Sequence, residues 1–191
     1  MRSVIWAFVA LHMTWVVPQP PIQGNHIRFE YHIPQLVELH MMGGMCSGSI
    51  VQLTPTSPAM ILTARHCVPT QQAVIVKFWD GAQRVFILDH AGVGEKADYS
   101  FLVGDTRNII PLHLNRKPTY EVNMVLLGSQ NGATILAARP EEDGEIPAIG
   151  WVKGGDSGSP LIGDNNEVIG VMSAAYSQIP ISVSVPARII K

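Results

Sequence analysis

The stretch Gly154–Ile162, GGDSGSPLI, places one serine, Ser157, between an acidic residue and a glycine. Such a stretch can be a polar turn between strands, or it can hold a nucleophile among backbone N–H groups that no side chain covers. A serine hydroxyl is a weak nucleophile at neutral pH and needs a histidine base, which a carboxylate orients. The positions of the histidines and aspartates therefore decide between the two interpretations.

The order of these residues along the chain excludes two catalytic architectures. All seven histidines precede Ser157, so the α/β-hydrolase order of serine, acid and histidine is excluded for this serine. The subtilisin order needs an aspartate before the histidine, but the first aspartate, Asp80, follows His66. The order that survives is histidine, aspartate, serine.

Composition excludes several classes of partner. The chain has 191 residues with 47% hydrophobic content, enough for one sizeable domain or two small halves that share an interface. The formal net charge is -2 and only 15% of residues are charged, so no nucleic-acid partner is expected. No H-E-x-x-H motif, second cysteine pair or spaced carboxylate loop is present, so we expect neither a metal site nor a cofactor.

The first residues differ from the rest of the chain. Arg2 precedes a mostly apolar run from Ser3 to Val17, and a proline cluster follows. A membrane span needs about 20 residues, so the run predicts a signal peptide or an apolar N-terminal anchor over residues 1–20. A buried N-terminal strand or the remnant of a membrane segment is the alternative. We therefore expect a secreted, periplasmic or extracellular monomer that contacts membrane only through this segment, if it stays uncleaved.

The two cysteines, Cys46 and Cys67, are either inert buried thiols or a disulfide. A secretory signal favours the disulfide because the bond persists in oxidising compartments. Closing a loop of about 20 residues stabilises a fold by roughly 3 kcal/mol in the chain-entropy model.

Short apolar segments bounded by Gly, Pro, Asn or Asp predict strands joined by turns, in an all-β sandwich or a pair of barrels. A single helical turn is expected near Ala64–Val68. The segment 106–120 is more polar, which predicts a connector. It would join an N-terminal half, residues 25–105, to a C-terminal half, residues 121–191. A cleft between two such halves is a favoured place for a binding or active site. Eleven segments carry the strand pattern: QLVEL, SGSIVQL, AMILT, AVIVKFW, RVFIL, YSFLVG, VNMVLLG, TILAAR, SPLIG, EVIGVMSA and ISVSV.

Five motifs in the same order resemble those of the chymotrypsin-like (trypsin-like) serine peptidases. LTARHC resembles the histidine motif Thr-Ala-x-His-Cys and departs from it at Arg65, and CSGSIV resembles the segment whose cysteine bridges to the one after the histidine. ADYSFLVGD is similar to the family's aspartate strand, and GGDSGSPLI matches the nucleophile motif with Ser159 in place of its second glycine. VIGVMSAA looks like the strand that lines the substrate pocket. The resemblance covers the chain from about Gln35 to Pro186.

The resemblance implies two six-stranded antiparallel β-barrels with the active site in the cleft between them. It implies a serine endopeptidase in which Ser157 is the nucleophile, His66 the base and Asp98 the orienting acid. The backbone N–H groups of Gly155 and Ser157 would form the oxyanion hole, and Cys46 would bridge to Cys67. Asp89, beside His90, is a competing acid, but we expect that pair at a solvated turn after RVFIL.

The resemblance also implies a substrate pocket with Trp151 at its base. Trypsin-type members carry an aspartate there, and glutamate-preferring ones a histidine where this chain has Met172, so apolar or small P1 residues are expected. Asp156 is expected to be buried and to need a partner, for which Lys153, Arg139 and Arg65 stay open. The segment PIQGN departs from the family's activation sequence. The remaining pocket residues would be Val152, Ser173, Ala174 and Ala175.

Three readings of the function remain. The first is a secreted, bacterial-type endopeptidase. The second is a viral, membrane-associated protease that processes a polyprotein, which the short loops and the Ser-Pro after the nucleophile also resemble. The third is a catalytically inactive homologue that uses the fold as a binding module, since a fold alone does not establish activity.

Overall fold

The structure is a computed structural model, and it describes residues 33–41, 43–68, 73–94, 96–116, 123–128, 132–138, 146–149, 152–163, 166–175 and 181–191. The predicted signal peptide or anchor, residues 1–20, lies outside the described residues. Within them, no helix has the length and apolar character needed to cross a membrane. Regular structure in this part of the chain consists of β-strands and two short 3-10 helices.

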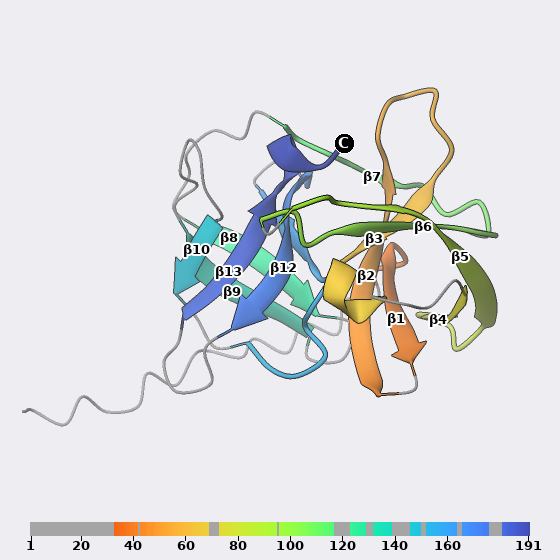
Figure 1. Ribbon diagram of the computed structural model, residues 1–191, viewed down its shortest axis with the longest axis horizontal. Helices are drawn as coiled ribbons and strands as arrows, with labels where there is room; N and C mark the ends of the chain where they lie inside the picture. The colour runs from red at the N-terminus through yellow and green to blue at the C-terminus, as the bar shows by residue number, and fades with distance from the viewer. Residues whose placement is uncertain are drawn as a thin grey trace, which may run out of the picture.

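The N-terminal strands form one seven-stranded sheet in the order β1-β4-β5-β6-β3-β2-β7. Neighbouring strands are antiparallel except for β2 and β7, which run parallel. Strand β1 pairs with β4 and also with β2, and Figure 1 shows these strands on the right. The strands are β1 (Leu36–Met41), β2 (Gly44–Gln52), β3 (Met60–Thr63), β4 (Ala73–Phe78), β5 (Gln83–Ala91), β6 (Ser100–Val103) and β7 (Leu112–His113).

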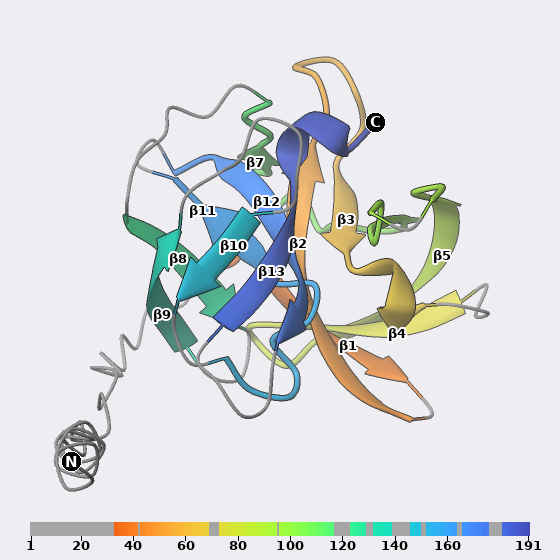
Figure 2. The same cartoon turned by 60° about the vertical axis from the view of Figure 1, so that its left-hand side comes forward.

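The C-terminal strands close into a barrel in the order β10-β13-β12-β11-β8-β9. Figure 2 shows this barrel beside the N-terminal sheet. The prediction of an all-β fold is confirmed, and this barrel is one of the two that were predicted. The strands are β8 (Asn123–Gly128), β9 (Gly132–Ala138), β10 (Ile146–Ile149), β11 (Pro160–Ile162), β12 (Val168–Ala175) and β13 (Ile181–Pro186).

Alternation along β4 shows why these segments become strands. Val74, Val76 and Phe78 are buried, whereas Ile75, between two of them, is 47% exposed. Successive side chains of a strand point to opposite faces, so one face packs into the core and the other meets solvent. Complete burial of an aliphatic or aromatic side chain is worth about 1.5 to 3 kcal/mol. The inward face of β4 therefore holds the strand in the sheet.

A shared hydrophobic core joins the two halves. It combines Leu62 and Phe101 of the N-terminal sheet with Val168, Val171 and Val185 of the barrel, and all five are fully buried. Because protein cores pack densely, the two halves cannot slide past each other without opening voids. Residues contributed by different halves are therefore held in a fixed relation.

Candidate active site

His66 lies on the first 3-10 helix, η1 (Arg65–Cys67), directly after β3 and Ala64. The predicted helical turn is confirmed at this place. Ala64 and Cys67 are buried in the core and hold the turn in place, whereas the His66 side chain is 46% exposed. The turn thus anchors its ends in the core and presents the imidazole to solvent.

Asp98 precedes β6 and binds His66 twice. Its Oδ2 lies 2.7 Å from Nδ1 of the imidazole, and its Oδ1 accepts a 2.9 Å hydrogen bond from the backbone N–H of His66. The carboxylate side chain is 16% exposed, far less than the ring it contacts. A carboxylate on Nδ1 holds the proton there and leaves Nε2 as the basic nitrogen.

A third side chain completes this group from the other half. Ser173, on β12, donates a 2.5 Å hydrogen bond from Oγ to Oδ2 of Asp98. Sequence reasoning placed Ser173 in the wall of the substrate pocket and missed this contact. No local pattern signals it, because the two residues are 75 positions apart.

The pKa values of the pair move apart. Burial raises the pKa of Asp98, but hydrogen bonds from the His66 ring, the Ser173 hydroxyl and the His66 backbone together outweigh it and hold that pKa at about 2. The hydrogen bond to Asp98 raises the pKa of His66 above its ordinary 6.5, although partial burial opposes the rise. Asp98 is therefore ionised at neutral pH and stabilises positive charge on the imidazole.

The loop that carries Ser157 docks on the N-terminal sheet through Ser47 of β2. The backbone N–H of Ser47 donates a 2.8 Å hydrogen bond to the Ser157 carbonyl, and its Oγ donates a 2.7 Å hydrogen bond to the Gly155 carbonyl. Thr63 Oγ1 donates in turn to the Ser47 carbonyl at 2.8 Å. The loop is thus tied on both sides of Asp156 to the strand beside η1.

Gly158 lets the loop approach this closely. Its φ is +83°, and a Cβ there would lie 2.1 Å from the Ser47 carbonyl and 2.3 Å from Thr63 Oγ1. Only glycine combines that backbone angle with the absence of a side chain. The glycine after the serine is therefore required by the docking of the loop.

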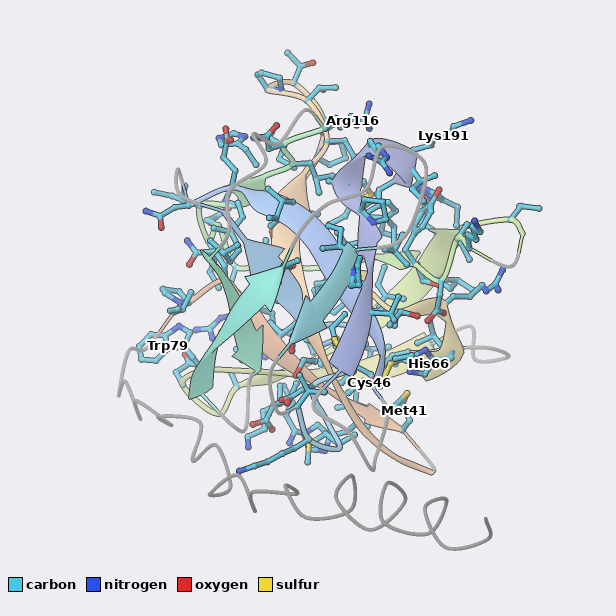
Figure 3. All side chains as sticks on the ribbon, turned by 90° about the vertical axis from the view of Figure 1, so that its left-hand side faces the viewer. Met41, Cys46, His66, Trp79, Arg116 and Lys191 are labelled. Atoms are coloured by element: carbon cyan, nitrogen blue, oxygen red, sulfur yellow. A yellow bond between two sulfur atoms is a disulfide. The ribbon has the colours of Figure 1, made fainter. Side chains whose placement is uncertain are left out.

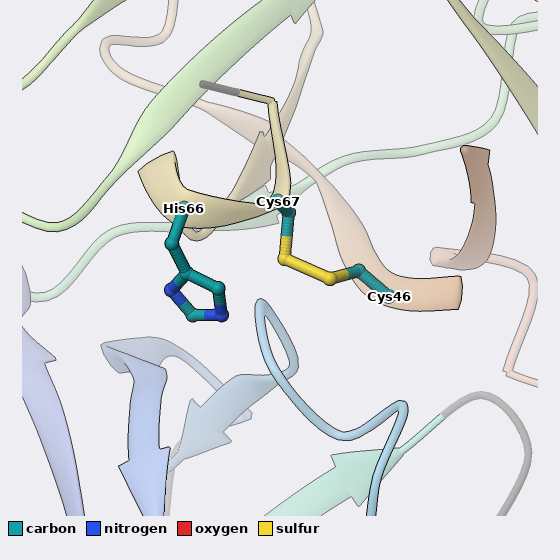
Figure 4. Close-up of side chains that lie close together, drawn as sticks. All are labelled: Cys46, His66 and Cys67. Atoms are coloured by element: carbon teal, nitrogen blue, oxygen red, sulfur yellow. A yellow bond between two sulfur atoms is a disulfide. The ribbon is translucent and has the colours of Figure 1, made fainter. Parts of the chain in front are cut away.

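A disulfide joins Cys46 to Cys67, as predicted. Figure 4 shows the bond beside the His66 ring, and Figure 3 shows His66 and Cys46 near each other in the whole molecule. Sγ of Cys67 lies 3.9 Å from the Ser157 carbonyl oxygen. The bond links the residue before Ser47 to the residue after His66, so it fixes His66 and the strand β2 relative to each other.

The side chains of Cys46, His66 and Cys67 lie close enough together to suggest metal binding, but their chemistry argues against it. The two sulfurs and the His66 ring lie within 4.8 Å of one another. Cysteine binds metals as a thiolate. Both sulfurs here are bonded to each other in the disulfide, so neither is a thiolate. The cluster is thus a histidine packed beside a disulfide.

Backbone hydrogen bonds shape the loop around Asp156. The N–H groups of Asp156, Gly158 and Ser159 donate to carbonyl oxygens at Lys153, Met172 and Asp156. Within the described part of the chain, the N–H groups of Gly155 and Ser157 donate to no residue. Gly155 has φ of +95°, a conformation that favours glycine.

Asp156 is 2% exposed, as expected for a buried carboxylate in this loop. Its Oδ2 accepts a 2.7 Å hydrogen bond from the backbone N–H of Lys153. Of the three candidate partners, Lys153 therefore contacts Asp156 through its main chain. Arg65 donates instead to the Gly92 carbonyl. Arg139 lies outside the described residues.

The predicted pocket is described only in part. Val152 is half-buried and packs against the cluster of Ile146, Leu161, Ile169 and Met172, and Ala174 is exposed. Trp151 and the side chain of Ala175 lie outside what the structure describes.

The competing acid lies elsewhere. Asp89 and His90 belong to β5, so their expected place at a turn is wrong. Oδ2 of Asp89 lies 2.6 Å from Nδ1 of His90, and Nε2 of His90 lies 3.0 Å from the Lys191 carbonyl. Both ring nitrogens of His90 are occupied, which leaves none to act as a base toward Ser157.

No protein-family model and no curated protein matches the chain. Solved structures do. The serine protease of a human pathogenic astrovirus is similar over 80% of this chain and 89% of its own, with a TM-score of 0.64 and 18% identity. The Rv3671c protease of M. tuberculosis, in its inactive form, is similar over 88% and 91%, with a TM-score of 0.64 and 21% identity. A serine endoprotease from Yersinia pestis is similar over 88% and 64%, with a TM-score of 0.63 and 19% identity.

These likenesses establish the fold. All three are chymotrypsin-like serine proteases, so the likeness to that fold is confirmed for the all-β architecture and for one closed six-stranded barrel.

Proposed function

We propose that this chain, which has the chymotrypsin-like fold, is a serine endopeptidase with Ser157 as nucleophile, His66 as general base and Asp98 as orienting acid. The observation that carries the proposal is the bonding of Asp98 to both the ring and the backbone of His66, next to the docked Ser157 loop. A catalytic base needs a fixed tautomer and a fixed ring, and a carboxylate at Nδ1 supplies both.

The reaction would proceed in two stages. Nε2 of His66 accepts the Ser157 hydroxyl proton as Oγ forms a bond to the carbonyl carbon of the substrate. The imidazolium then gives that proton to the leaving amine, and the C–N bond breaks to leave an acyl-enzyme. Water adds to the acyl carbon with His66 again as base, and its proton returns to Ser157 as the acid product leaves. Asp98 stays ionised throughout, in line with its pKa of about 2.

The oxyanion hole would consist of the backbone N–H groups of Gly155 and Ser157. These two N–H groups donate to no described residue, whereas their neighbours in the loop do. Removing one such donor typically costs about 3 to 4 kcal/mol of transition-state stabilisation.

The substrates would be peptides or proteins, with apolar or small P1 residues. Support comes from the sequence at the expected pocket, Trp151, Val152, Ser173, Ala174 and Ala175, which contains no charged side chain. Charged P1 residues would lose their hydration there without a partner. The reaction needs no cofactor.

We also interpret the N-terminal sheet as the second barrel of the fold. The pairing of β1 with both β2 and β4 supports this interpretation. The predicted halves, residues 25–105 and 121–191, would then be the two barrels, with residues 106–120 between them.

Hydrolysis of a peptide library by the purified chain tests the activity. We expect cleavage after apolar or small residues, its loss in Ser157→Ala, and its retention in Ser159→Ala. Ser159 is a matched control because it is a fully buried serine in the same loop. Equal cleavage by wild type and Ser157→Ala would refute the proposal, and cleavage confined to sites after Lys or Arg would refute its specificity. A folded wild type that cleaves nothing would favour the binding module.

The cellular setting is a separate proposal. The disulfide supports a secreted, periplasmic or extracellular protein, since such bonds persist in oxidising compartments. That this protein is a monomer is part of the same proposal. The likeness to an astrovirus serine protease supports a viral enzyme as a second candidate. Membrane association and the processing of a polyprotein belong to that candidate as proposals. N-terminal sequencing of the expressed chain distinguishes them. A product that begins after residue 20 supports secretion, and a membrane-bound product that retains residues 1–20 supports the second candidate.

A further inference from the structure

Arg65, the residue at which LTARHC departs from the family motif, makes a defined contact. Its Nη1 donates a 2.9 Å hydrogen bond to the Gly92 carbonyl, and the contact is partly buried. Arg65 is the first residue of η1 and directly precedes His66. The short helix that carries the base therefore also carries a cation that reaches another segment.

Gly92 begins the segment that ends at Asp98. The Gly92 N–H donates to the Tyr99 carbonyl at 2.8 Å, and the Tyr99 N–H donates to the Ala97 carbonyl at 2.9 Å. Asp98 lies between the last two residues. Holding Gly92 thus holds both residues that flank the acid.

The packing at Gly92 makes this transmission tight. A Cβ on Gly92 would lie 2.2 Å from the Ala97 carbonyl oxygen and 2.6 Å from the Tyr99 ring. Backbone in such close contact cannot shift alone, because interiors are packed without slack. A displacement of Gly92 would therefore displace Ala97 and Tyr99 with it.

We propose that Arg65 is a positioning residue that fixes the Asp98 segment relative to η1. The two elements meet at two places, Arg65 with Gly92 and His66 with Asp98, one at each end of the segment. The first contact lies outside the triad and sets the distance and angle at which the second forms. The inference rests on the proposed function for its effect on catalysis, but not for its effect on His66.

Arginine suits this task. Its guanidinium stays charged and is planar, with donors in a fixed arrangement. Hydrogen bonds from a charged donor are stronger than those between neutral groups. Lysine keeps the charge but not the planar geometry, so it should restore part of the effect.

Steady-state kinetics and NMR titration of the His66 ring test the role in Arg65→Ala, Arg65→Lys and the control Arg84→Ala. Arg84 is an arginine on β5 whose ion pair, with Asp105 at 3.5 Å, is exposed. We expect kcat in Arg65→Ala to fall about tenfold to a hundredfold with KM unchanged, since small misplacements of catalytic groups have effects of that size. The pKa of His66 should fall, Arg65→Lys should lie between, and Arg84→Ala should match wild type.

The same substitution in an Asp98→Asn background shows whether Arg65 acts through Asp98. We expect Arg65→Ala to change neither the rate nor the His66 pKa further in that background, because coupled residues are not additive. An equal fold-loss in both backgrounds, or an unchanged His66 pKa in Arg65→Ala, would overturn the inference.

Gly92→Ala serves as the second variant if Arg65→Ala does not fold. Its Cβ would clash with Ala97 and Tyr99, which flank Asp98, so we expect the same lower kcat and lower His66 pKa. Gly43→Ala is the matched control, since a Cβ there meets nothing within 4 Å. A wild-type His66 pKa in Gly92→Ala would count against the inference. The NMR readout needs no peptidase activity, so failure of the proposed function and failure of this inference remain distinguishable.

Discussion

Oγ of Ser173, on the barrel strand β12, donates a 2.5 Å hydrogen bond to Oδ2 of Asp98, which precedes β6 of the N-terminal sheet. Oδ2 of Asp98 also lies 2.7 Å from Nδ1 of His66. One carboxylate oxygen is therefore shared by the imidazole of His66 from one half and the hydroxyl of Ser173 from the other. The geometry of the His66–Asp98 pair therefore depends on how the two halves are joined.

Replacing Ser173 with alanine should weaken this arrangement. Asp98 loses one of the hydrogen bonds that lower its pKa, so that pKa should rise. Hydrogen bonds to charged groups contribute about 1.5 to 3 kcal/mol, and we expect Ser173→Ala to lose roughly that in unfolding free energy and about tenfold in kcat/KM. Urea unfolding and peptide kinetics measure both.

Ser184→Ala is the matched control. Ser184 is a fully buried serine on β13, and among the described residues its Oγ donates to Met172 Sδ at 3.8 Å. Its loss should be smaller because thioether sulfur is a weak acceptor. Equal losses in the two variants would contradict the role assigned to Ser173.

The pH dependence of kcat/KM should reflect the His66–Asp98 pair. His66 must be neutral to accept a proton, and its pKa is raised above 6.5, so activity should fall as pH drops through a value above 6.5. In Asp98→Asn the pKa of His66 should decrease, and the acidic limb should move to lower pH. The rate at the optimum should fall by about 10⁴-fold, as in a comparable triad. An acidic limb that stays in place in Asp98→Asn would show that another group titrates.

Gly158→Ala should disrupt the loop that carries Ser157. The added Cβ meets the Ser47 carbonyl at 2.1 Å, and the φ of +83° is unfavourable for alanine. Strain and overpacking together predict a loss of about 2 to 5 kcal/mol in unfolding free energy and no measurable activity. Gly154→Ala should remain stable, since a Cβ at Gly154 meets nothing within 4 Å. Thermal unfolding of the two variants checks this, and similar Tm values would contradict the docking role.

Removing the disulfide should destabilise the fold. Cys46 and Cys67 are 21 positions apart, and opening a loop of this size costs roughly 3 kcal/mol in the chain-entropy model. The double variant Cys46→Ser/Cys67→Ser should therefore unfold at lower denaturant concentration than wild type. Reductant should shift the wild-type curve to the same midpoint and leave the variant unchanged. A wild-type midpoint that does not respond to reductant would contradict the prediction.

Local pattern was sufficient for most strands. All eleven predicted segments overlap strands of the structure. Within the described residues, the pattern missed two strands: β7, with two residues, and β10, whose sequence Ile146–Ile149 contains Pro147. Proline argues against a strand because it lacks an N–H donor, yet β10 pairs with β13 at this residue. Barrel closure, a tertiary effect, outweighed local preference there.

The candidate site also contains residues that local sequence motifs predict and contacts that only the tertiary structure reveals. His66, Asp98 and Ser157 lie in motifs that a sequence displays directly. The contacts of Ser173 with Asp98, of Ser47 with the Ser157 loop and of Arg65 with Gly92 join residues 27 to 108 positions apart. Such pairs meet only after segments that are distant along the chain have packed, within the N-terminal half for Arg65 and Gly92 and between the halves for the other two, so no local pattern indicates them. Asp156 is a milder case, because its backbone partner, Lys153, is three positions away.

Covalent labelling of the folded protein with a fluorophosphonate, followed by mass spectrometry of the peptide that contains residue 157, tests the central claim most directly. A nucleophile activated by His66 should form one adduct, on Ser157, in wild type and in Ser159→Ala. Labelling should be absent in Ser157→Ala and strongly slowed in His66→Ala. An adduct on another residue, or equal labelling of wild type and Ser157→Ala, would contradict the claim that Ser157 is the nucleophile of a serine peptidase.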